Sequence, residues 1–218
     1  MNLLYHTVSG IINRNLNFKG NTDSSMNIQT QKKIILASKS PRRAELIRLL
    51  GYEYETAGFE TDETFSSSLS AEENCIAAAC GKAGETARRR GIGAGEIIIG
   101  ADTAAVCGGS IFTKPKDRSE AYAMLKMFSG RSHDVISGVC ILCEDSQTAF
   151  STSTKVFFSE LSCKEINDYI DTGEPFDKAG GYAVQGGAAK FITSVDGCFY
   201  NVMGLPLSAI YQHLKDIM

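Results

Sequence analysis

Residues 33–51 read KIILASKSPRRAELIRLLG, and this stretch decides the fold class. After the first lysine, four apolar residues follow one another, which predicts a short buried strand. A helix is expected to follow from Pro41 to Leu50. Ser40 is a good N-cap, Pro41 suits the first helical position, and Gly51 is a common helix stop. A buried strand that leads directly into a helix is typical of an α/β protein.

The same alternation of strands and helices continues to the end of the chain. Polar capping patterns that begin at Ser70, Asp117 and Ser162 each place a glutamate three residues later, which predicts three further helix starts. We expect helices over 71–90, 118–129, 163–172 and 207–217, and strands over 96–101, 111–112, 132–143, 148–158, 189–195 and 198–203. Several of these strands would be joined by hairpins, as at Asp196-Gly197. The chain therefore predicts one α/β domain with a mixed, twisted sheet and flanking helices.

The composition excludes several classes of protein. The chain has 218 residues, 43% of them hydrophobic, and a net charge of −3. It contains no apolar run near the roughly 20 residues that span a membrane. The negative charge argues against a nucleic-acid-binding protein that depends on bulk positive charge. We therefore expect neither a membrane nor a nucleic acid as a partner.

The seven cysteines are odd in number and scattered along the chain. This pattern favours reduced, buried thiols in a cytoplasmic protein over a disulfide framework. Cys140 and Cys143 form a C-x-x-C pair, but no second pair or nearby histidine completes a zinc site. We therefore interpret both as strand residues, with a metal site as the less favoured alternative.

The first 32 residues differ from the rest of the chain. They are rich in Asn, Thr and Ser, show weak apolar periodicity and lack the apolar core of a signal peptide. We expect residues 1–32 to form a disordered extension and residues 33–218 to form the domain. Deletion of residues 1–25 should therefore leave activity and melting temperature unchanged.

Two arginines in the first turn of the predicted helix point to a functional site. The amino end of a helix carries free N–H groups and a partial positive charge, so Arg42 and Arg43 should each cost a few tenths of a kcal/mol, up to ~1 kcal/mol. A bound anion would remove this penalty, because helix N–H groups, the hydroxyls of Ser38 and Ser40 and two guanidinium groups form a strong phosphate site. The alternative is a solvated basic helix start.

The positions of two further side chains, Asp102 and His133, also bear on function. Asp102 is expected at the end of an apolar strand, where a carboxylate is costly unless it binds something. The alternative is a turn cap that involves Thr103. His133 is interpreted as a structural histidine, with a pH-switch role as the alternative. Because no arrangement of Ser, His and Asp or of Cys and His is evident, covalent catalysis is disfavoured.

Seven short motifs resemble those of one known family, and they occur in the family's order over residues 33–216. They are SKSPRRAEL (38–46), GADT (100–103), KP (114–115), SG-x-x-H-x-V (129–135), DKAG (177–180), VQG (184–186) and V-x-GLP (202–206). The sequence is similar to the Maf family of nucleotide pyrophosphatases. This resemblance implies a Maf-like domain with two lobes around a nucleotide cleft. It also implies hydrolysis of a nucleoside triphosphate to the monophosphate and pyrophosphate.

The resemblance assigns roles to individual residues. Asp102 and Glu63 match acidic positions that hold a divalent metal, Mg²⁺ or Mn²⁺, and activate water. Hard cations of this kind prefer oxygen ligands. Lys82 and Lys114 match positions that touch the phosphates, together with Arg42, Arg43, Ser38 and Ser40. Without the resemblance, Lys82 would be interpreted as a surface lysine, although Gly81 and Gly84 beside it would let another chain segment approach.

The segment over 177–187 resembles the family branch that acts on dTTP and UTP. Asp177 and Lys178 belong to this motif and are expected to bind substrate. Gln185 is expected in a short strand, where its amide can both donate to and accept from a base. The alternatives are a strand-end surface residue at Gln185 and a different, modified purine nucleotide as substrate.

A non-catalytic nucleotide sensor that affects cell division is the remaining alternative. An acid at position 102 among cations favours catalysis, because a binding protein would not need it. A homodimer in the cytoplasm is what the resemblance implies for the assembly.

Overall fold

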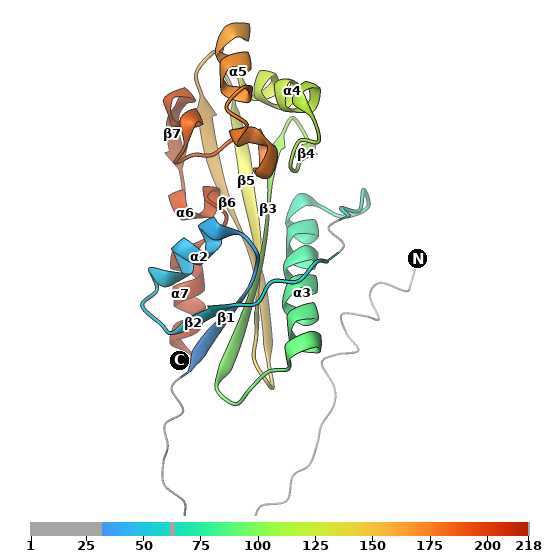
Figure 1. Ribbon diagram of the computed structural model, residues 1–218, viewed down its shortest axis with the longest axis vertical. Helices are drawn as coiled ribbons and strands as arrows, with labels where there is room; N and C mark the ends of the chain where they lie inside the picture. Colours follow the sequence, from blue (N-terminus) through green and yellow to red (C-terminus); the bar gives the residue numbers. More distant parts are fainter. Residues whose placement is uncertain (1–31, 62–63, 218) are drawn as a thin grey trace, which may run out of the picture.

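A computed structural model describes residues 32–61 and 64–217 (Figure 1). Its strands are β1 (Lys33–Ala37), β2 (Tyr54–Thr56), β3 (Glu96–Cys107), β4 (Ser110–Phe112), β5 (Ser132–Leu142), β6 (Gln147–Phe158) and β7 (Ile192–Asp196). In this part of the chain they form one sheet in the order β2-β1-β3-β5-β6-β7, with β4 beside β3. β1 is parallel to β2 and β3, and the remaining pairs are antiparallel. The predicted mixed sheet is confirmed.

Helices α2, α3, α4 and α5 begin where the polar caps predicted them. The helices of the described residues are α2 (Pro41–Arg48), α3 (Ala71–Arg90), α4 (Arg118–Phe128), α5 (Cys163–Ile170), α6 (Phe199–Val202) and α7 (Leu207–Lys215), with 3-10 helices η1 (Glu174–Asp177), η2 (Ala179–Gly181) and η3 (Gly187–Phe191). The side chains of Ser40, Ser70, Asp117 and Ser162 each accept a hydrogen bond from the backbone N–H three residues later.

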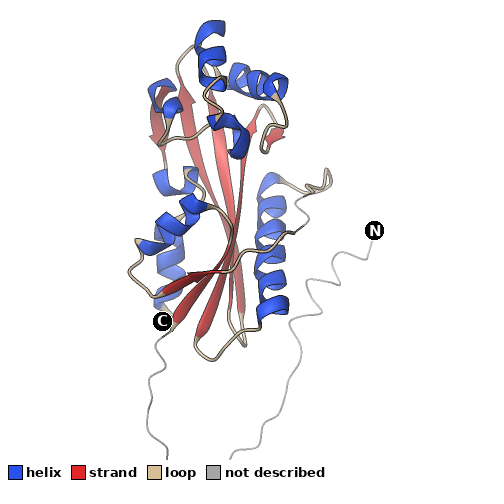
Figure 2. Cartoon of the chain, in the orientation of Figure 1, coloured by secondary structure: helices blue, strands red, loops and turns tan. Residues whose placement is uncertain are grey.

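Two lobes share the three long strands β3, β5 and β6 (Figure 2). In the first lobe, β1, β2 and the adjoining halves of the long strands carry α3 on one face and α2 and α7 on the other (Figure 1). In the second lobe, α4, α5, η2 and η3 pack on the other ends of the long strands, on the face that α2 and α7 cover in the first lobe. Each lobe has its own apolar core. Ile34, Leu36, Leu46, Ile99, Val139, Ile210 and Leu214 belong to the first, and Leu125, Phe128, Val156, Ile166, Tyr169 and Phe191 to the second.

α3 lies directly on the backbone of the sheet because two strand residues are glycines. A Cβ at Gly100 would lie 2.2 Å from the carbonyl oxygen of Ala79, and one at Gly138 would lie 2.2 Å from the carbonyl carbon of Cys75. The predicted close approach at Gly81 and Gly84 is wrong, since a Cβ at either would have no atom within 4 Å. The glycines that bring the helix close are on the strands, and those on the helix face outward.

Several expected local structures differ from the observed ones. The strand expected over 189–195 begins only at Ile192, because η3 extends to Phe191. β3 continues past Asp102 to Cys107, because β5 pairs with it from Ile98 to Val106, so Asp102 lies within a strand and not at its end. Residues 198–203 do not form a strand. They contain α6, whose fully buried Asn201 donates to the Val135 carbonyl (2.9 Å) and to Thr154 Oγ1 (3.0 Å).

Gln185 also lies outside any strand, in a turn closed by a hydrogen bond from Gly186 N to the Ala183 carbonyl (3.1 Å). Two glycines shortly before it, Gly180 and Gly181, have φ of 71° and 72°, which breaks an extended chain.

The remaining expectations concern the N-terminal extension, Glu63, the cysteines and the possibility of a membrane span. Residues 1–31 of the proposed extension lie outside the described residues. Glu63 also lies outside them. All seven cysteines are free thiols, but only Cys75, Cys107 and Cys140 are buried. Three others are half-buried and Cys163 is exposed. Cys140 and Cys143 pack into different apolar clusters, and the described residues contain no group of three potential metal-ligating side chains. No helix in residues 32–61 and 64–217 is both long and apolar enough to cross a membrane.

Candidate functional site

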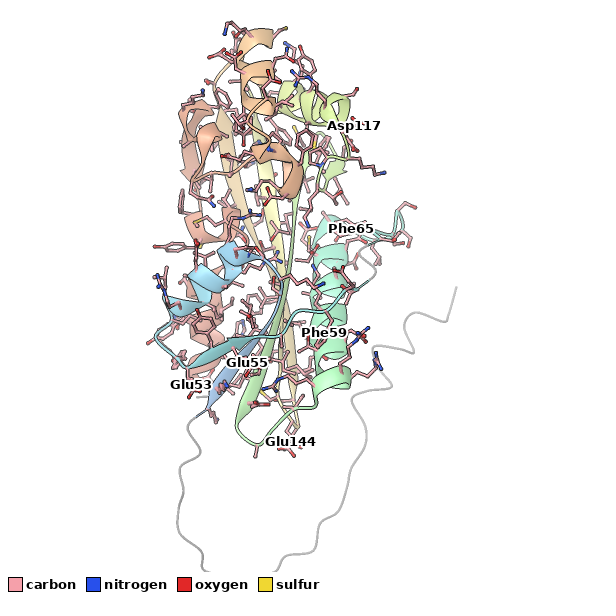
Figure 3. All side chains as sticks on the ribbon, viewed as in Figure 1. Glu53, Glu55, Phe59, Phe65, Asp117 and Glu144 are labelled. Atoms are coloured by element: carbon pink, nitrogen blue, oxygen red, sulfur yellow. The ribbon has the colours of Figure 1, made fainter. Side chains whose placement is uncertain are left out.

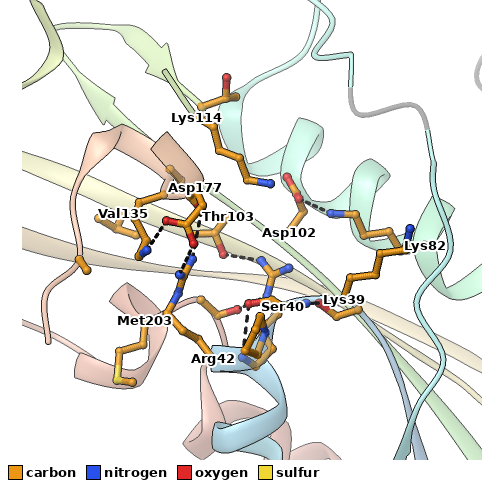
Figure 4. Close-up of a pocket in the computed structure, with 18 of the residues that line it drawn as sticks. Lys39, Ser40, Arg42, Lys82, Asp102, Thr103, Lys114, Val135, Asp177 and Met203 are labelled. Atoms are coloured by element: carbon orange, nitrogen blue, oxygen red, sulfur yellow. Dashed lines mark hydrogen bonds and ion pairs between the residues drawn. The ribbon is translucent and has the colours of Figure 1, made fainter. Parts of the chain in front are cut away.

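A cleft of about 500 Å³ opens where the edge of β3 is uncovered. β1 pairs with β3 only as far as Gly100, and β4 pairs with it only from Ala105 onward. In the described part of the chain, residues 101–104 therefore have no strand beside them on this edge. The chain leaves β1 here and enters the loop before α2, so the amino end of α2 faces Asp102 and Thr103 across the gap (Figure 4).

The structure brings ten of the eleven predicted site residues into this one cleft. They are Ser38, Ser40, Arg42, Arg43, Lys82, Asp102, Lys114, Asp177, Lys178 and Gln185, and the eleventh, Glu63, lies outside the described residues. Among the described lining residues, the cationic side chains are Lys39, Arg42, Arg43, Lys82, Lys114 and Lys178, and the acidic ones are Glu60, Asp102 and Asp177. This excess of positive charge suits a polyanion such as a triphosphate.

The loop before α2 is shaped by its two serines. Ser38 Oγ accepts from Ser40 N (3.1 Å), and Ser40 Oγ accepts from Arg43 N (3.5 Å) as the helix cap. Ser38 is buried, whereas Ser40 is half-buried. The hydroxyls and the first N–H groups of α2 therefore lie at the wall of the cleft, where an anion would meet them.

The arginines at the start of α2 have protein partners, which the sequence could not show. Arg43 donates to the Gly204 carbonyl from Nε (2.8 Å) and to Thr103 Oγ1 from Nη2 (3.1 Å). Arg42 donates to the Asp177 carboxylate (3.2 Å) and backbone carbonyl (3.3 Å). These contacts offset part of the electrostatic cost expected for two cations at this helix end. They also fix where the guanidinium groups lie.

Asp102 and Lys82 form an ion pair at the base of the cleft. Lys82 Nζ lies 2.6 Å from Asp102 Oδ1, and the two side chains are only 10% and 11% exposed. Lys82 comes one helical turn after Ala79, the residue that touches the backbone of β3 at Gly100. The glycine contacts therefore set the depth of α3 and bring this lysine within reach of the acid. Removing one partner of a buried pair of this kind strongly destabilises the folded protein, because the other charge is left without compensation.

Asp177 links the two lobes across the cleft. Its carboxylate contacts Arg42 on α2 and also forms an ion pair with Lys178. Burial raises the pKa of Asp177, but the hydrogen bonds and charges of Lys178 and Arg42 outweigh burial and lower the pKa overall. Asp177 is thus held as a carboxylate that positions two cations.

Lys114 approaches from the second lobe, and Figure 4 shows its side chain extending toward Asp102. The lysine is exposed and precedes Pro115, which is buried and favours an extended backbone before it. Gly180 N donates to the Thr113 carbonyl (3.0 Å), so the strand-end segment with Lys114 is tied to the segment that carries Asp177 and Lys178.

His133 is a structural residue of the second lobe, as the sequence favoured. It is 2% exposed, its Nε2 lies 2.8 Å from the Tyr182 hydroxyl, and its ring stacks on Phe128. Burial lowers the pKa of His133 to about 4. Because Tyr182 lines the cleft, the histidine supports the cleft wall from behind.

Sequence reasoning missed several lining residues. Thr103 joins Arg43 to a buried network, since Thr103 Oγ1 lies 2.8 Å from Ser137 Oγ, which donates to the Asn201 carbonyl (3.2 Å). Lys39 was given no role, yet it lines the cleft and pairs with Glu60. For Thr103, the available signal in the sequence was its position directly after Asp102.

The chain between β2 and α3 contributes two aromatic residues to the cleft, Phe59 and Phe65 (Figure 3). Gly58 places this segment against the loop before α2, because a Cβ there would lie 2.4 Å from the Ser38 carbonyl carbon. An isolated glycine in a loop gave no signal of this contact in the sequence.

The donor set of the cleft fits a divalent metal shared with phosphate. Mg²⁺ usually binds through one or two carboxylates and substrate phosphates and keeps several waters. Asp102 supplies a carboxylate that is nearly buried beside the phosphate-type cations. A dedicated cage of three acids is not needed for such a site.

The chain is similar to known proteins both in sequence and in fold. The family model described as Maf-like protein matches residues 33–217. The dTTP/UTP pyrophosphatase of Chlorobaculum parvum is 42% identical over 190 residues, covering 86% of this chain and 96% of that protein. The dTTP/UTP pyrophosphatase of Caldicellulosiruptor saccharolyticus is 44% identical over 190 residues, covering 85% and 95%. The solved Ham1 protein of Staphylococcus aureus aligns with a TM-score of 0.51 at 13% identity, covering 86% of this chain and all of that one, which shows a shared fold.

Proposed function

Because the chain belongs to the Maf family, we propose that it hydrolyses dTTP and UTP to the monophosphate and pyrophosphate. The observation that carries this proposal is Asp102, a nearly buried carboxylate at the gap in the sheet, surrounded by the cations of both lobes. An acid in this position serves hydrolysis, whereas simple binding of a polyanion would be weakened by it.

The phosphates are bound between the lobes. The N–H groups and serine hydroxyls at the start of α2, with Arg42 and Arg43, hold the phosphates from the first lobe. Lys114 and Lys178 approach them from the second lobe. These cations stabilise the negative charge that develops on the leaving pyrophosphate. Asp177 keeps Arg42 and Lys178 in place before substrate binds.

Asp102 orients the attacking water and accepts its proton. The bond between the α-phosphorus and the bridging oxygen to the β-phosphorus breaks as the bond from water forms, and the pyrophosphate leaves. Lys82, whose Nζ lies 2.6 Å from Asp102 Oδ1, holds the carboxylate in place. Asp102 and Glu63 would hold the divalent metal, Mg²⁺ or Mn²⁺. When bound, the metal neutralises phosphate charge and polarises the bond to be broken.

Gln185 reads the base. Its amide can donate and accept at the same time, which matches the adjacent acceptor and donor on the Watson–Crick edge of thymine or uracil. Gln185 is exposed and lines the cleft from the second lobe. The base would therefore lie against the segment 182–187, while the phosphates lie against α2.

A substrate screen tests the reaction and the base together. Purified protein would be incubated with each common and modified nucleoside triphosphate, with and without Mg²⁺ or Mn²⁺, and pyrophosphate release would be measured. We expect metal-dependent release that favours dTTP and UTP, and Gln185→Ala should reduce the preference. Release that favours a purine would keep the mechanism and overturn the base assignment. No release from any nucleotide would favour the nucleotide-sensing alternative.

We also propose that the protein works as a homodimer in the cytoplasm. Phe199 and Tyr200 on α6 and Tyr211 on α7 are exposed aromatic residues that a partner subunit could cover. The free thiols fit a reducing compartment. Sedimentation equilibrium of the full chain, with Tyr211→Ser as the variant, tests the dimer: the wild type should sediment at twice the chain mass, and a monomer would contradict it.

A further inference from the structure

The segment that carries Gln185 lacks regular secondary structure and is held in place by two side chains. Tyr169, at the end of α5, has a hydroxyl that donates to Glu174 Oε1 (2.7 Å) and accepts from the backbone N–H of Ala183 (3.2 Å). The Glu174 carboxylate in turn accepts from the backbone N–H of Gly187, at 3.1 Å to each oxygen. We call Tyr169 and Glu174 the clamp.

The two attachment points of the clamp lie symmetrically about Gln185. Ala183 is two residues before it and Gly187 two residues after it. Between them, Gly186 N donates to the Ala183 carbonyl (3.1 Å) and closes the turn. The turn can therefore neither shift along the chain nor open without breaking a bond of the clamp.

The clamp is closely packed on the side away from the cleft. Tyr169 is 1% exposed, and its ring meets Phe191 edge-on at 5.7 Å. A Cβ at Gly186 would lie 2.4 Å from Glu174 Oε1, and one at Gly187 would lie 3.3 Å from the Tyr169 ring. Two successive glycines thus let the carboxylate reach the backbone of the turn. Burial, followed by the bond to Glu174, raises the pKa of the Tyr169 hydroxyl, so it stays protonated and able to donate.

We propose that Tyr169 and Glu174 are positioning residues for base selection, which fix the direction of Gln185. This inference rests on the proposed reading of the base by Gln185. An amide selects between bases only when its donor and acceptor are held in one orientation, because a mobile amide can match several base edges. Among the described residues, the hydrogen bonds of the Tyr169 and Glu174 side chains go neither to Asp102 nor to a cation of the cleft. Glu174 meets Lys178 only through its backbone carbonyl, which lies 3.5 Å from Lys178 Nζ and is kept in every Glu174 variant. Loss of the clamp side chains should therefore affect selection more than turnover.

The test compares steady-state kinetics of Tyr169→Phe, Glu174→Ala and Glu174→Gln with the wild type. The two nucleoside triphosphates that the wild type separates most would be used, and kcat and KM would be measured for each. In Tyr169→Phe and Glu174→Ala, we expect the ratio of the two kcat/KM values to fall about tenfold, the size of one lost hydrogen bond. The loss should come from the preferred nucleotide, with the disfavoured one within about twofold of wild type.

Glu174→Gln and a control variant, Tyr122→Phe, separate positioning from general damage. Glu174→Gln keeps an acceptor for Gly187 N and should restore part of the ratio. Tyr122→Phe removes a hydroxyl that bonds to Cys163 on the α4–α5 side of the lobe, away from the turn, and should leave the ratio unchanged. Melting temperatures of all variants show whether each one folds.

The outcomes keep the two proposals apart. If the wild type releases pyrophosphate and prefers one base, but all clamp variants keep that preference, the clamp proposal is wrong. A uniform loss of kcat/KM for both nucleotides would also contradict it, because it would indicate a purely structural role. If the wild type releases no pyrophosphate at all, the proposed function fails before the clamp is tested.

Discussion

The two lobes supply their parts of the cleft in different ways. In the first lobe, Asp102 lies on a long strand and Lys82 on a 20-residue helix, and contacts at Gly100 and Gly138 lock these elements together. In the second lobe, the chain from 174 to 191 consists of short 3-10 helices and the turns between them, which hydrogen bonds between side chains and backbone hold in place. The first lobe therefore holds Asp102 and Lys82 on long, closely packed elements, and the second holds Gln185 on a turn fixed by a few hydrogen bonds.

The two lobes also differ in how deeply their ion pairs are buried, and burial determines how much the loss of one partner destabilises the protein. The Asp102–Lys82 pair is about 10% exposed on both sides. In the Asp177–Arg42 pair, the acid is 68% exposed and the arginine 24%. Loss of a partner should thus have large consequences in the first lobe and small ones between the lobes.

Asp102→Asn is expected to have the largest effect. The amide keeps the size of the side chain but cannot accept the proton of water, so kcat should fall by at least ~10² while nucleotide still binds. Turnover and calorimetric binding of dTTP would be compared with the wild type. Asp134→Asn, an acid on β5 outside the cleft, is the matched control. Near-normal turnover in Asp102→Asn would remove Asp102 from the mechanism.

Acid should weaken the second lobe through His133. Its pKa is about 4 in the folded chain, against an ordinary 6.5. Since the folded-state pKa is lowered, the stability contributed by neutral His133 is full above pH 6.5 and is lost as pH falls from 6.5 to about 4. The loss should be on the order of 3 kcal/mol.

Urea unfolding from pH 7.5 to 4 would measure this loss. His133→Gln should show a smaller acid-dependent decrease, and His213→Gln should keep it because His133 is intact. Equal pH dependence in the wild type and in His133→Gln would show that other groups are responsible.

The packing of α3 can be tested with paired glycine substitutions. Gly100→Ala places a methyl group against the carbonyl of Ala79 and should cost about 1–3 kcal/mol of stability, with reduced turnover as Lys82 moves. Gly84→Ala lies on the open side of the same helix and should gain up to ~1 kcal/mol from helix propensity. Urea unfolding of both variants would reveal the contrast, and similar changes in the two would contradict the packing account.

Asp177→Asn should have the smallest effect on stability. The pair with Arg42 is largely solvated, so its loss should change the free energy of unfolding by less than ~1 kcal/mol. KM for dTTP should rise, because Arg42 and Lys178 lose their shared partner. A stability loss above ~2 kcal/mol would show that this contact holds the lobes together.

The same contrast explains what the sequence could predict. The starts of α2, α3, α4 and α5 followed from polar caps, and the strands from apolar runs. These signals are local in the chain. The ten candidate residues that share the cleft could be predicted because of the resemblance to the Maf family. No local pattern in the sequence places Lys82 beside Asp102.

The failures lie where distant contacts decide the structure. Asn201 turns residues 199–202 into a helix through bonds to β5 and β6, and the clamp fixes a turn where a strand was expected. The length of β3 depends on its partner β5, which apolarity alone does not reveal. Gly58 and Gly100 likewise have no signature, because the atoms they approach are far away in the sequence.

Product analysis of dTTP hydrolysis would show which phosphoanhydride bond is cleaved and whether Asp102 is required. Wild-type protein and Asp102→Asn would be incubated with dTTP and Mg²⁺, with a chelator in parallel, and all phosphorus-containing products quantified over time. We expect equal amounts of dTMP and pyrophosphate from the wild type, no product with the chelator, and at most ~1% of the wild-type rate in the variant. Formation of dTDP and orthophosphate, or an unchanged rate in Asp102→Asn, would contradict this expectation.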